Sequence, residues 1–276
     1  MFPPFVNVPD YYTDRSCKIK AKYKLLEKEL FSQLKFAEIL YNKHKSLYGR
    51  RMKNMVLFPW RWICMKDLPF FTTQFGVASL SLSQIPLKKE AYIRIQQTQD
   101  PEQLLQECCS FCRAVGAERI YASGCASLDQ YPVHTDIIQM ECLRSNLSNT
   151  DAQLCLVTNE NLPRWLEIYN QHMLDVPNAK LLTHTQARKI CESGNAYYIY
   201  GTGTLLGIGS VSENVISSVV SVVPGCGREV VLALNRVLTG DTAVVEVASK
   251  NLRAIKLYEK LGFCKTKELS HWYRIM

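Results

Sequence analysis

One stretch near the C-terminus decides the fold: VVEVASKNLRAIKLYEKLGF, residues 244–263. Its first four residues are mostly β-branched, which favours a buried strand. Ser249 or Asn251 can cap a helix, because a short polar side chain accepts hydrogen bonds from the free amides of the first turn. Gly262 suits the left-handed residue that ends many helices. The stretch therefore predicts a strand, a capped helix and a second strand that starts at Phe263. The helix has an apolar stripe made of Leu252, Ile255, Leu257 and Leu261.

The same stretch resembles a known motif. The spacing N-x-x-A-x-x-x-Y-x-x-x-G-F after a strand is similar to the last motif of the GNAT superfamily of N-acetyltransferases. Here it is made of Asn251, Ala254, Tyr258, Gly262 and Phe263. The resemblance covers about residues 151–276. It implies an α/β fold with a mixed, strongly twisted central sheet flanked by helices, and acetyl transfer from acetyl-CoA to a primary amine.

The hydrophobic pattern of the C-terminal half predicts the element order of a GNAT domain throughout. Strands are expected at residues 153–157, 196–200, 205–211, 215–223 and 244–247. Helices are expected at residues 162–173, 183–193, 228–238 and 252–261. Thr183 or Thr185 is the expected cap of the second of these helices.

Residues 75–143 also alternate between strand and helix patterns. Strands are expected at 76–82, 91–97, 118–122 and 133–143, and Asp100 caps a helix that begins at Pro101. This order echoes the second half of a GNAT fold, but it lacks the five-residue motif and any helix between its last strands. We interpret it as a degenerate relative without its own cofactor site. The polar segment 145–151 predicts a boundary near residue 150, with domains at 1–150 and 151–276.

The first part of the chain has a different pattern. Residues 1–16 are predicted to form an extended arm, and apolar residues recur every three or four positions from Lys18 to Tyr48. This periodicity predicts a long amphipathic helix whose other face is mostly lysine. The basic and aromatic segment around Trp60-Arg61-Trp62 either anchors a core or stacks on bases. A nucleic-acid or ribosome-associated binding protein is therefore kept as an alternative function.

The composition of the 276 residues limits the class of protein. Hydrophobic residues make up 47% of the chain, enough for a core, and no apolar run approaches the ~20 residues that cross a bilayer. The N-terminus lacks the pattern of a signal peptide, so we expect a cytoplasmic protein without a membrane partner. Eleven cysteines without an export signal indicate reduced thiols. The net charge of +8 suits an anionic partner such as CoA.

Three of these cysteines, Cys108, Cys109 and Cys112, cluster on the helix predicted after Asp100. Neither a second C-x-x-C nor a histidine pair at zinc-ligand spacing accompanies them. Helix packing is therefore the favoured interpretation of this cluster, and the sequence predicts no metal site.

The segment Pro224-Gly225-Cys226-Gly227-Arg228 leads from a strand into a helix. A glycine-rich turn at a helix N-terminus points free amides at an anion, and the GNAT resemblance places the CoA pyrophosphate here. The sequence departs from the family, because Val222 stands where Arg or Gln is usual and the loop is several residues short. Arg228 can supply a compensating charge. Cys226 is a small filler or a thiol whose pKa is lowered by the helix N-terminus. The resemblance implies donor-binding roles for Val222, Val223, Gly225, Cys226, Gly227, Arg228, Asn251, Ala254 and Tyr258.

Two residues are candidates for acid–base chemistry. In the families that the motif resembles, the tyrosine at the position of Tyr258 protonates the departing CoA thiolate, and the asparagine at Asn251 helps to hold the pantetheine arm. Glu246 lies in an otherwise apolar strand, where partial burial would raise its pKa toward that of a useful base. An outward-facing Glu246 in a salt bridge is the alternative. The spacing from Glu246 to Tyr258 is similar to that of ribosomal-protein alanine N-acetyltransferases, which use a strand glutamate as base. Glu213 is the reserve candidate.

The mechanism that the resemblance implies is direct transfer. The base takes a proton from the acceptor ammonium, and the amine attacks the thioester. Amides of Val222 or Val223 polarise the thioester carbonyl, and Tyr258 protonates the thiolate. A non-catalytic acyl-CoA-binding or sensing module is a further alternative, favoured by the short loop. The sequence leaves the acceptor amine and the oligomeric state open.

Overall fold

The computed structural model describes residues 70–276. The predicted arm at 1–16, the long helix from Lys18 to Tyr48 and the segment around Trp60-Arg61-Trp62 lie outside these residues. The strands are β1 (Phe70–Thr73), β2 (Gly76–Ser81), β3 (Glu90–Thr98), β4 (Arg119–Ser123), β5 (Val133–Leu143), β6 (Gln153–Leu156), β7 (Ala196–Gly201), β8 (Thr204–Ser212), β9 (Val215–Ser221), β10 (Thr242–Ala248) and β11 (Cys264–Arg274). The helices are α2 (Ile85–Lys88), α3 (Pro101–Ala114), α4 (Leu162–Met173), α5 (His184–Glu192), α6 (Gly227–Asn235) and α7 (Leu252–Lys260), with 3₁₀ turns at Ala126–Gln130 and Arg144–Asn146.

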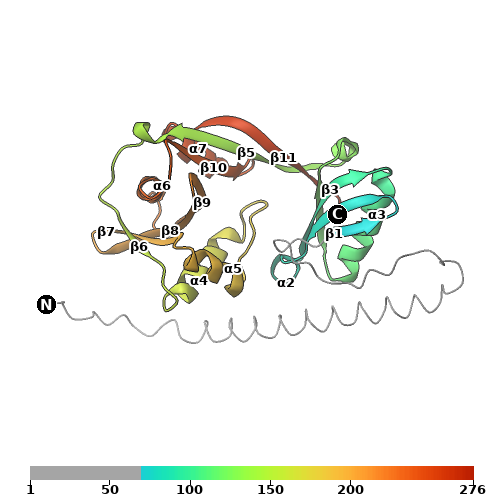
Figure 1. Ribbon diagram of the computed structural model, residues 1–276, viewed down its shortest axis with the longest axis horizontal. Coiled ribbons are helices and arrows are strands. Elements are labelled where there is room, and N and C mark those ends of the chain that lie inside the picture. The colour runs from blue at the N-terminus through green and yellow to red at the C-terminus, as the bar shows by residue number, and fades with distance from the viewer. Residues whose placement is uncertain (1–69) are drawn as a thin grey trace, which may run out of the picture.

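The strands form one mixed sheet of eleven strands in the order β1-β2-β3-β4-β11-β5-β10-β9-β8-β7-β6. Figure 1 shows a strongly curled sheet, with β1–β4 at one end, β6–β9 at the other and the long strands β5 and β11 between them. The pairs β3–β4 and β9–β10 are parallel, because helices α3 and α6 cross between their strands. The predicted mixed, strongly twisted sheet flanked by helices is confirmed.

Helices cover both faces of the C-terminal part of the sheet. Side chains alternate along each strand, so one set packs against α6 and α7 and the other against α4 and α5. On β9, for example, Val219 packs with the first core and Val220 with the second. Helix α3 buries its apolar face against β2, β3 and β4 in a separate core. Within residues 70–276, no helix is long and apolar enough to cross a membrane.

Strands β5 and β11 join the two ends of the sheet. β5 pairs along its length with β10 on one side and with β11 on the other. β11 in turn pairs with β4 through Tyr273 and Arg274. Strand β5 therefore lies between the two strands that flank α7, although it precedes residue 150 in the chain. The boundary near residue 150 stays a prediction.

Helix α7 begins and ends as its sequence predicts. The Asn251 Oδ1 atom accepts a hydrogen bond from Ala254 N at 3.2 Å, which identifies Asn251 as the cap. Gly262 follows the helix with a φ of 90°, in the left-handed region that favours glycine. One detail is wrong: Leu252 is 62% exposed and does not belong to the apolar stripe of α7.

The other predicted elements are confirmed with small shifts at their ends. Thr183 forms a capping box at the start of α5, and the Asp100 side chain caps α3. Between β4 and β5 there is only a 3₁₀ turn, as the N-terminal pattern predicted. Strand β1 and the short helix α2 were not predicted.

The cysteine cluster of α3 is buried. Burial raises the pKa of Cys108 to about 12, of Cys109 to about 11 and of Cys112 to about 12. Because the thiolate is the reactive form of cysteine, these side chains are inert packing groups at neutral pH. The packing interpretation of this cluster is confirmed.

The curl of the sheet brings two distant segments into contact. Gln84, immediately before α2, is buried and forms two hydrogen bonds with the backbone of Leu181. Its Nε2 donates to Leu181 O at 3.1 Å, and Leu181 N donates to its Oε1 at 2.9 Å. Lys88 Nζ donates to Ala179 O at 3.5 Å and lies 3.4 Å from Oε2 of the buried Glu90. The loop between α4 and α5 is thereby tied to the N-terminal end of the sheet.

Candidate active site

Strands β9 and β10 separate after a short paired start. Only two residue pairs join them, and the last of these is Ile216–Val245. The next residue of β9, Ser217, is an extra residue relative to the neighbouring strand β8. A bulge of this kind bends a strand and increases its twist. We call the unpaired stretch beyond it, residues 217–221 of β9 and 246–248 of β10, the β9–β10 opening.

The backbone of β9 presents free polar groups to this opening. Val222 N and Val223 N both donate to Leu206 O, at 2.9 and 3.4 Å, so neither predicted amide is free to polarise a thioester carbonyl. In an antiparallel ladder alternate residues face alternate neighbours. Since Val222 faces β8, the amides of Val219 and Ser221 face the opening, where β10 forms no pairs with them. The free amides on this side of β9 are therefore those of Val219 and Ser221, and not those predicted at Val222 and Val223.

Helix α6 begins at the same end of β9. Gly225 has a φ of 88°, which a residue with a side chain rarely adopts, and it turns the chain into the helix. A Cβ atom on Gly227 would lie 3.0 Å from Leu257 Cδ2, so glycine lets α6 start close to α7. The Cys226 side chain makes no capping hydrogen bond. The amides of residues 227–229 have no acceptor within residues 70–276, at the positive end of the helix dipole.

Arg228 already has partners beside these amides. Its Nη1 lies 3.3 Å from Glu229 Oε1, and its Nη2 donates to Ser148 Oγ at 2.6 Å. Glu229 Oε2 accepts from Thr150 Oγ1 at 3.2 Å. The Arg228 side chain is 50% exposed, and an ion pair so open to water is weak. The predicted compensation of the short loop by Arg228 stays a prediction, and it requires this pair to open.

Tyr258 lies on the face of α7 that packs onto the sheet, one turn beyond Ala254. Its ring centroid is 5.7 Å from that of Phe263, and only 7% of the residue is exposed. Its hydroxyl has no hydrogen-bond partner in the described part of the chain. Burial raises the pKa of Tyr258 to about 12, so the phenol keeps its proton at neutral pH.

Glu246 is exposed, so the partial burial expected of it is not found. Its neighbours Val245 and Val247 belong to the core beneath α6 and α7. Alternation along β10 therefore directs Glu246 to the opposite face, the one on which α4 and α5 lie. The salt bridge considered for Glu246 is not formed with any of the described residues. Glu246 and Tyr258 thus lie on opposite faces of the sheet.

The sequence patterns missed a group of polar side chains beside Glu246, made of Gln139 and Glu141 on β5 and Thr266 on β11. Gln139 of β5 is the cross-strand partner of Glu246, and its Nε2 donates to Glu141 Oε1 at 2.5 Å. Thr266 Oγ1 donates to the same oxygen at 3.0 Å. No sequence spacing links β5 to β10, so only the strand pairing reveals this group. Glu213 lies in the exposed turn before β9, at the end of the strand that pairs with β10. The opening begins beyond this paired end, so the geometry does not support Glu213 as the base.

Comparisons with known proteins support the fold. No family model matches the chain, and no curated protein matches its sequence. A conserved protein of unknown function from Staphylococcus epidermidis ATCC 12228 has a TM-score of 0.50 and 12% identity, over 75% of this chain and 94% of that one. A protein from Pyrococcus horikoshii, provisionally assigned as an acetyltransferase, has a TM-score of 0.51 and 12% identity, over 73% of this chain and 69% of that one.

A GCN5-related N-acetyltransferase from Sphaerobacter thermophilus is also similar, with a TM-score of 0.46 and 16% identity, over 72% of this chain and 75% of that one. Identities this low are evidence of shared fold and not of shared chemistry. The chain has the fold of the GNAT acetyltransferases, and its five-residue motif occupies the strand–helix–strand unit in which the resemblance placed it.

Proposed function

We propose that this protein is an N-acyltransferase that moves an acetyl group from acetyl-CoA to a primary amine. The observation that supports this most is the β9–β10 opening, which has free strand amides on one side and the N-terminus of α6 at its end. A fold alone does not define an activity, so the proposal depends on what these groups can bind and which protons they can move.

The free groups match the parts of acetyl-CoA. The pantetheine arm is extended and contains amides, so it can pair with Val219 and Ser221 as an added strand pairs with a sheet edge. The pyrophosphate fits the free amides of residues 227–229, because the N-terminus of a helix favours an anion. Asn251 Oδ1 is used in capping α7, which leaves its NH₂ group for a pantetheine carbonyl.

The acid and the base have the exposures that their roles require. Acetyl-CoA supplies the thioester when it is bound. Glu246, exposed on the face of α4 and α5, takes the proton of the acceptor ammonium directly or through a water. Tyr258, buried on the other face, gives its proton to the departing thiolate. Because the acetyl group lies at the far end of the arm from the pyrophosphate, Val219 N, the free amide farther from α6, is the donor that polarises the thioester carbonyl.

The experiment that tests this proposal is thermal unfolding with acetyl-CoA, CoA and ATP, followed by an acetylation assay with a panel of amines. A ligand that binds only the folded protein, present at about 100 times its Kd, adds roughly 2.7 kcal/mol to the free energy of unfolding. We expect stabilisation by acetyl-CoA and CoA and none by ATP. No stabilisation by either CoA compound would contradict the proposal.

Two variants separate binding from chemistry. Ser221→Pro removes one amide that faces the opening and no ladder bond to β8, so we expect a folded protein with weakened CoA binding. Glu246→Gln should bind CoA like the unmodified protein and lose transfer to amines. Binding of CoA without transfer to any amine of the panel would favour the non-catalytic acyl-CoA-binding alternative.

A further inference from the structure

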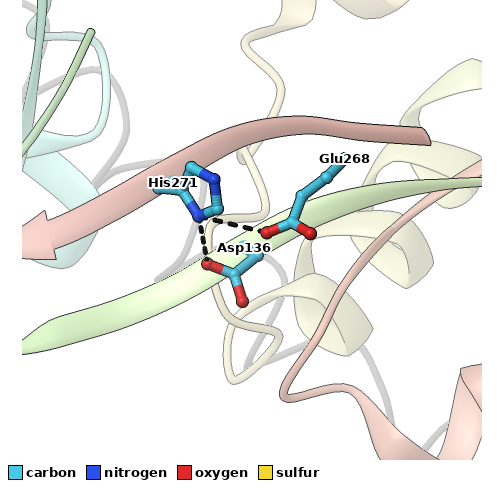
Figure 2. A group of neighbouring side chains, drawn as sticks. All are labelled: Asp136, Glu268 and His271. Carbon is cyan, nitrogen blue, oxygen red and sulfur yellow. Dashed lines mark hydrogen bonds and ion pairs between the residues drawn. The ribbon is translucent and has the colours of Figure 1, made fainter. Parts of the chain in front are cut away.

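Three side chains that commonly bind metals converge outside the candidate active site. Asp136 lies on β5, and Glu268 and His271 lie on the neighbouring strand β11. Figure 2 shows one nitrogen of the His271 ring directed at both carboxylates; this atom, Nδ1, lies 3.0 Å from Asp136 Oδ1 and 3.1 Å from Glu268 Oε1. The three ligand atoms all lie within 4.8 Å of one another.

A bulge in β11 produces this convergence. Residues three apart on a regular strand, such as Glu268 and His271, point to opposite faces. Leu269 is an extra residue relative to β5, and it resets the alternation between them. As a result, Glu268 and His271 share the face on which Asp136 lies. Bulges re-aim side chains in this way next to functional sites of other proteins.

Each carboxylate has one oxygen held by another residue and one oxygen directed at His271. Ser249 Oγ donates to Asp136 Oδ2 at 3.3 Å, and Lys265 Nζ donates to Glu268 Oε2 at 3.0 Å. The remaining oxygens, Oδ1 and Oε1, both face His271 Nδ1. This nitrogen carries at most one hydrogen, so it cannot give a full hydrogen bond to both oxygens. The two carboxylate oxygens therefore share a single hydrogen-bond donor. A divalent cation could bind both oxygens and the nitrogen at once.

We propose that Asp136, Glu268 and His271 bind a zinc ion, with water in the fourth position. In a tetrahedral zinc site with ligands at about 2.0–2.2 Å, neighbouring ligand atoms lie roughly 3.3 Å apart. The observed spacings of 3.0 and 3.1 Å are close to that value. One imidazole and two carboxylates suit Zn²⁺ better than Mg²⁺ or Ca²⁺, which prefer oxygen ligands throughout.

The surroundings of the cluster fit such a site. The side chains of Asp136, Glu268 and His271 are 27%, 34% and 56% exposed, which leaves access for the ion and its water. Ser249 and Lys265 hold the outer oxygens, and partners of this kind orient metal ligands. The sequence prediction of no metal site missed this group because no ligand spacing links Asp136 to β11.

A zinc ion at this site stabilises the fold by linking β5 to β11. Through Asp136 it also restrains the end of β10. Ser249 N donates to Asp136 O at 2.8 Å, and Asp136 N donates to Ser249 Oγ at 3.0 Å. Ser249 lies two residues before Asn251, the cap of α7. The ion therefore stabilises the start of α7 without touching the reacting groups, and its binding does not depend on the proposed acyl transfer.

The test is calorimetric titration of the chelator-treated, reduced full-length protein with Zn²⁺, with Mg²⁺ and Ca²⁺ as comparisons. We expect one zinc per chain, and an affinity at least tenfold lower in both His271→Gln and Glu268→Gln. His172→Gln, on the exposed side of α4, is the matched control and should bind zinc like the unmodified protein. Thermal unfolding should show a rise in Tm with zinc for the unmodified protein and for His172→Gln only.

Thiols are the competing ligands, so Co²⁺ absorption provides a second readout. Thiolate-to-cobalt charge-transfer bands would place the metal on cysteines such as the exposed Cys155 or Cys264, and they would overturn the proposal. So would an unchanged zinc affinity in Glu268→Gln or His271→Gln, or the absence of zinc binding at one per chain. Because Glu268 is at an exposed strand position, its variant is expected to fold even where His271→Gln does not.

Discussion

Tyr258 and Glu246 differ in burial and lie on opposite faces of the sheet. A buried phenol resists ionisation, because the phenolate would be desolvated, and so it remains a proton donor. An exposed carboxylate can reach an ammonium group that arrives from solvent. The two residues are thus suited to opposite directions of proton transfer.

Tyr258→Phe tests the donor role at the scale of one atom. The variant keeps the ring and removes the hydroxyl, which has no hydrogen-bond partner among residues 70–276. We expect kcat for amine acetylation to fall about 100-fold or more, with acetyl-CoA affinity and the free energy of unfolding nearly unchanged. Steady-state kinetics and calorimetry measure these quantities, and Tyr197→Phe on β7 is the control. An unchanged kcat would remove Tyr258 from the mechanism.

The raised pKa of Tyr258 also predicts how stability depends on pH. The phenol titrates near 10 in an unfolded chain and at about 12 in the folded protein. Below about pH 10 both states keep the proton. From about pH 10 to 12 the unfolded chain loses it while the folded protein retains it, so the free energy of unfolding falls as pH rises. Denaturant unfolding across this range should show a shallower fall in Tyr258→Phe; identical slopes in both proteins would contradict the burial argument.

At the scale of elements, the capped helix α7 holds the motif in place. Asn251 begins the helix through its side chain, and the helix buries Tyr258 against the sheet. We expect Asn251→Ala to lower the free energy of unfolding by about 1 kcal/mol, the usual cost of losing an N-cap. Asn251→Asp keeps a capping oxygen, so urea denaturation should find it close to the unmodified protein. Equal stability of Asn251→Ala and the unmodified protein would mean that the cap is dispensable.

Elements of this chain were predictable because their signals are local. The hydrophobic periodicity is read within the element itself. Helix caps such as Thr183 and helix-ending residues such as Gly262 lie within a few residues of the helix that they begin or end. The β9–β10 opening depends instead on the bulge at Ser217, which exists only relative to β8. The partial burial expected of Glu246 was wrong for the same reason. Alternation along β10 determines on which face of the sheet the side chain lies, but not which residues cover that face. The group of Asp136, Glu268 and His271 requires both a strand pairing and the bulge at Leu269.

At the scale of the whole molecule, the sheet is continuous and its two ends are tied together. Strand β5 lies between β10 and β11, and the loop between α4 and α5 contacts the segment before α2. Figure 1 shows one curled body in which β5 and β11 span between the two ends. The face that presents Glu246 is therefore bounded by helices from one half of the chain and by strands from the other.

Gln84→Ala tests the contact that closes this curl. The substitution leaves the N–H and C=O groups of Leu181 without their buried partners, and an unsatisfied buried group costs about 1–3 kcal/mol. We expect a loss of free energy of unfolding in this range. Gln96→Ala, which removes a bond to Ser79 from a more exposed side chain, should cost less and serves as the control. A loss no larger than that of Gln96→Ala would show that the two ends are not coupled through Gln84.

Hydrogen exchange of backbone amides, with and without CoA, tests the central claim most directly. If the acyl donor lies along β9 with its pyrophosphate at α6, then CoA should slow exchange at Val219, Ser221 and residues 227–229. Val220 and Val222, which face β8, should change much less at the same CoA concentration. Protection confined to other segments, or equal protection of both sets of β9 amides, would contradict donor binding in the β9–β10 opening.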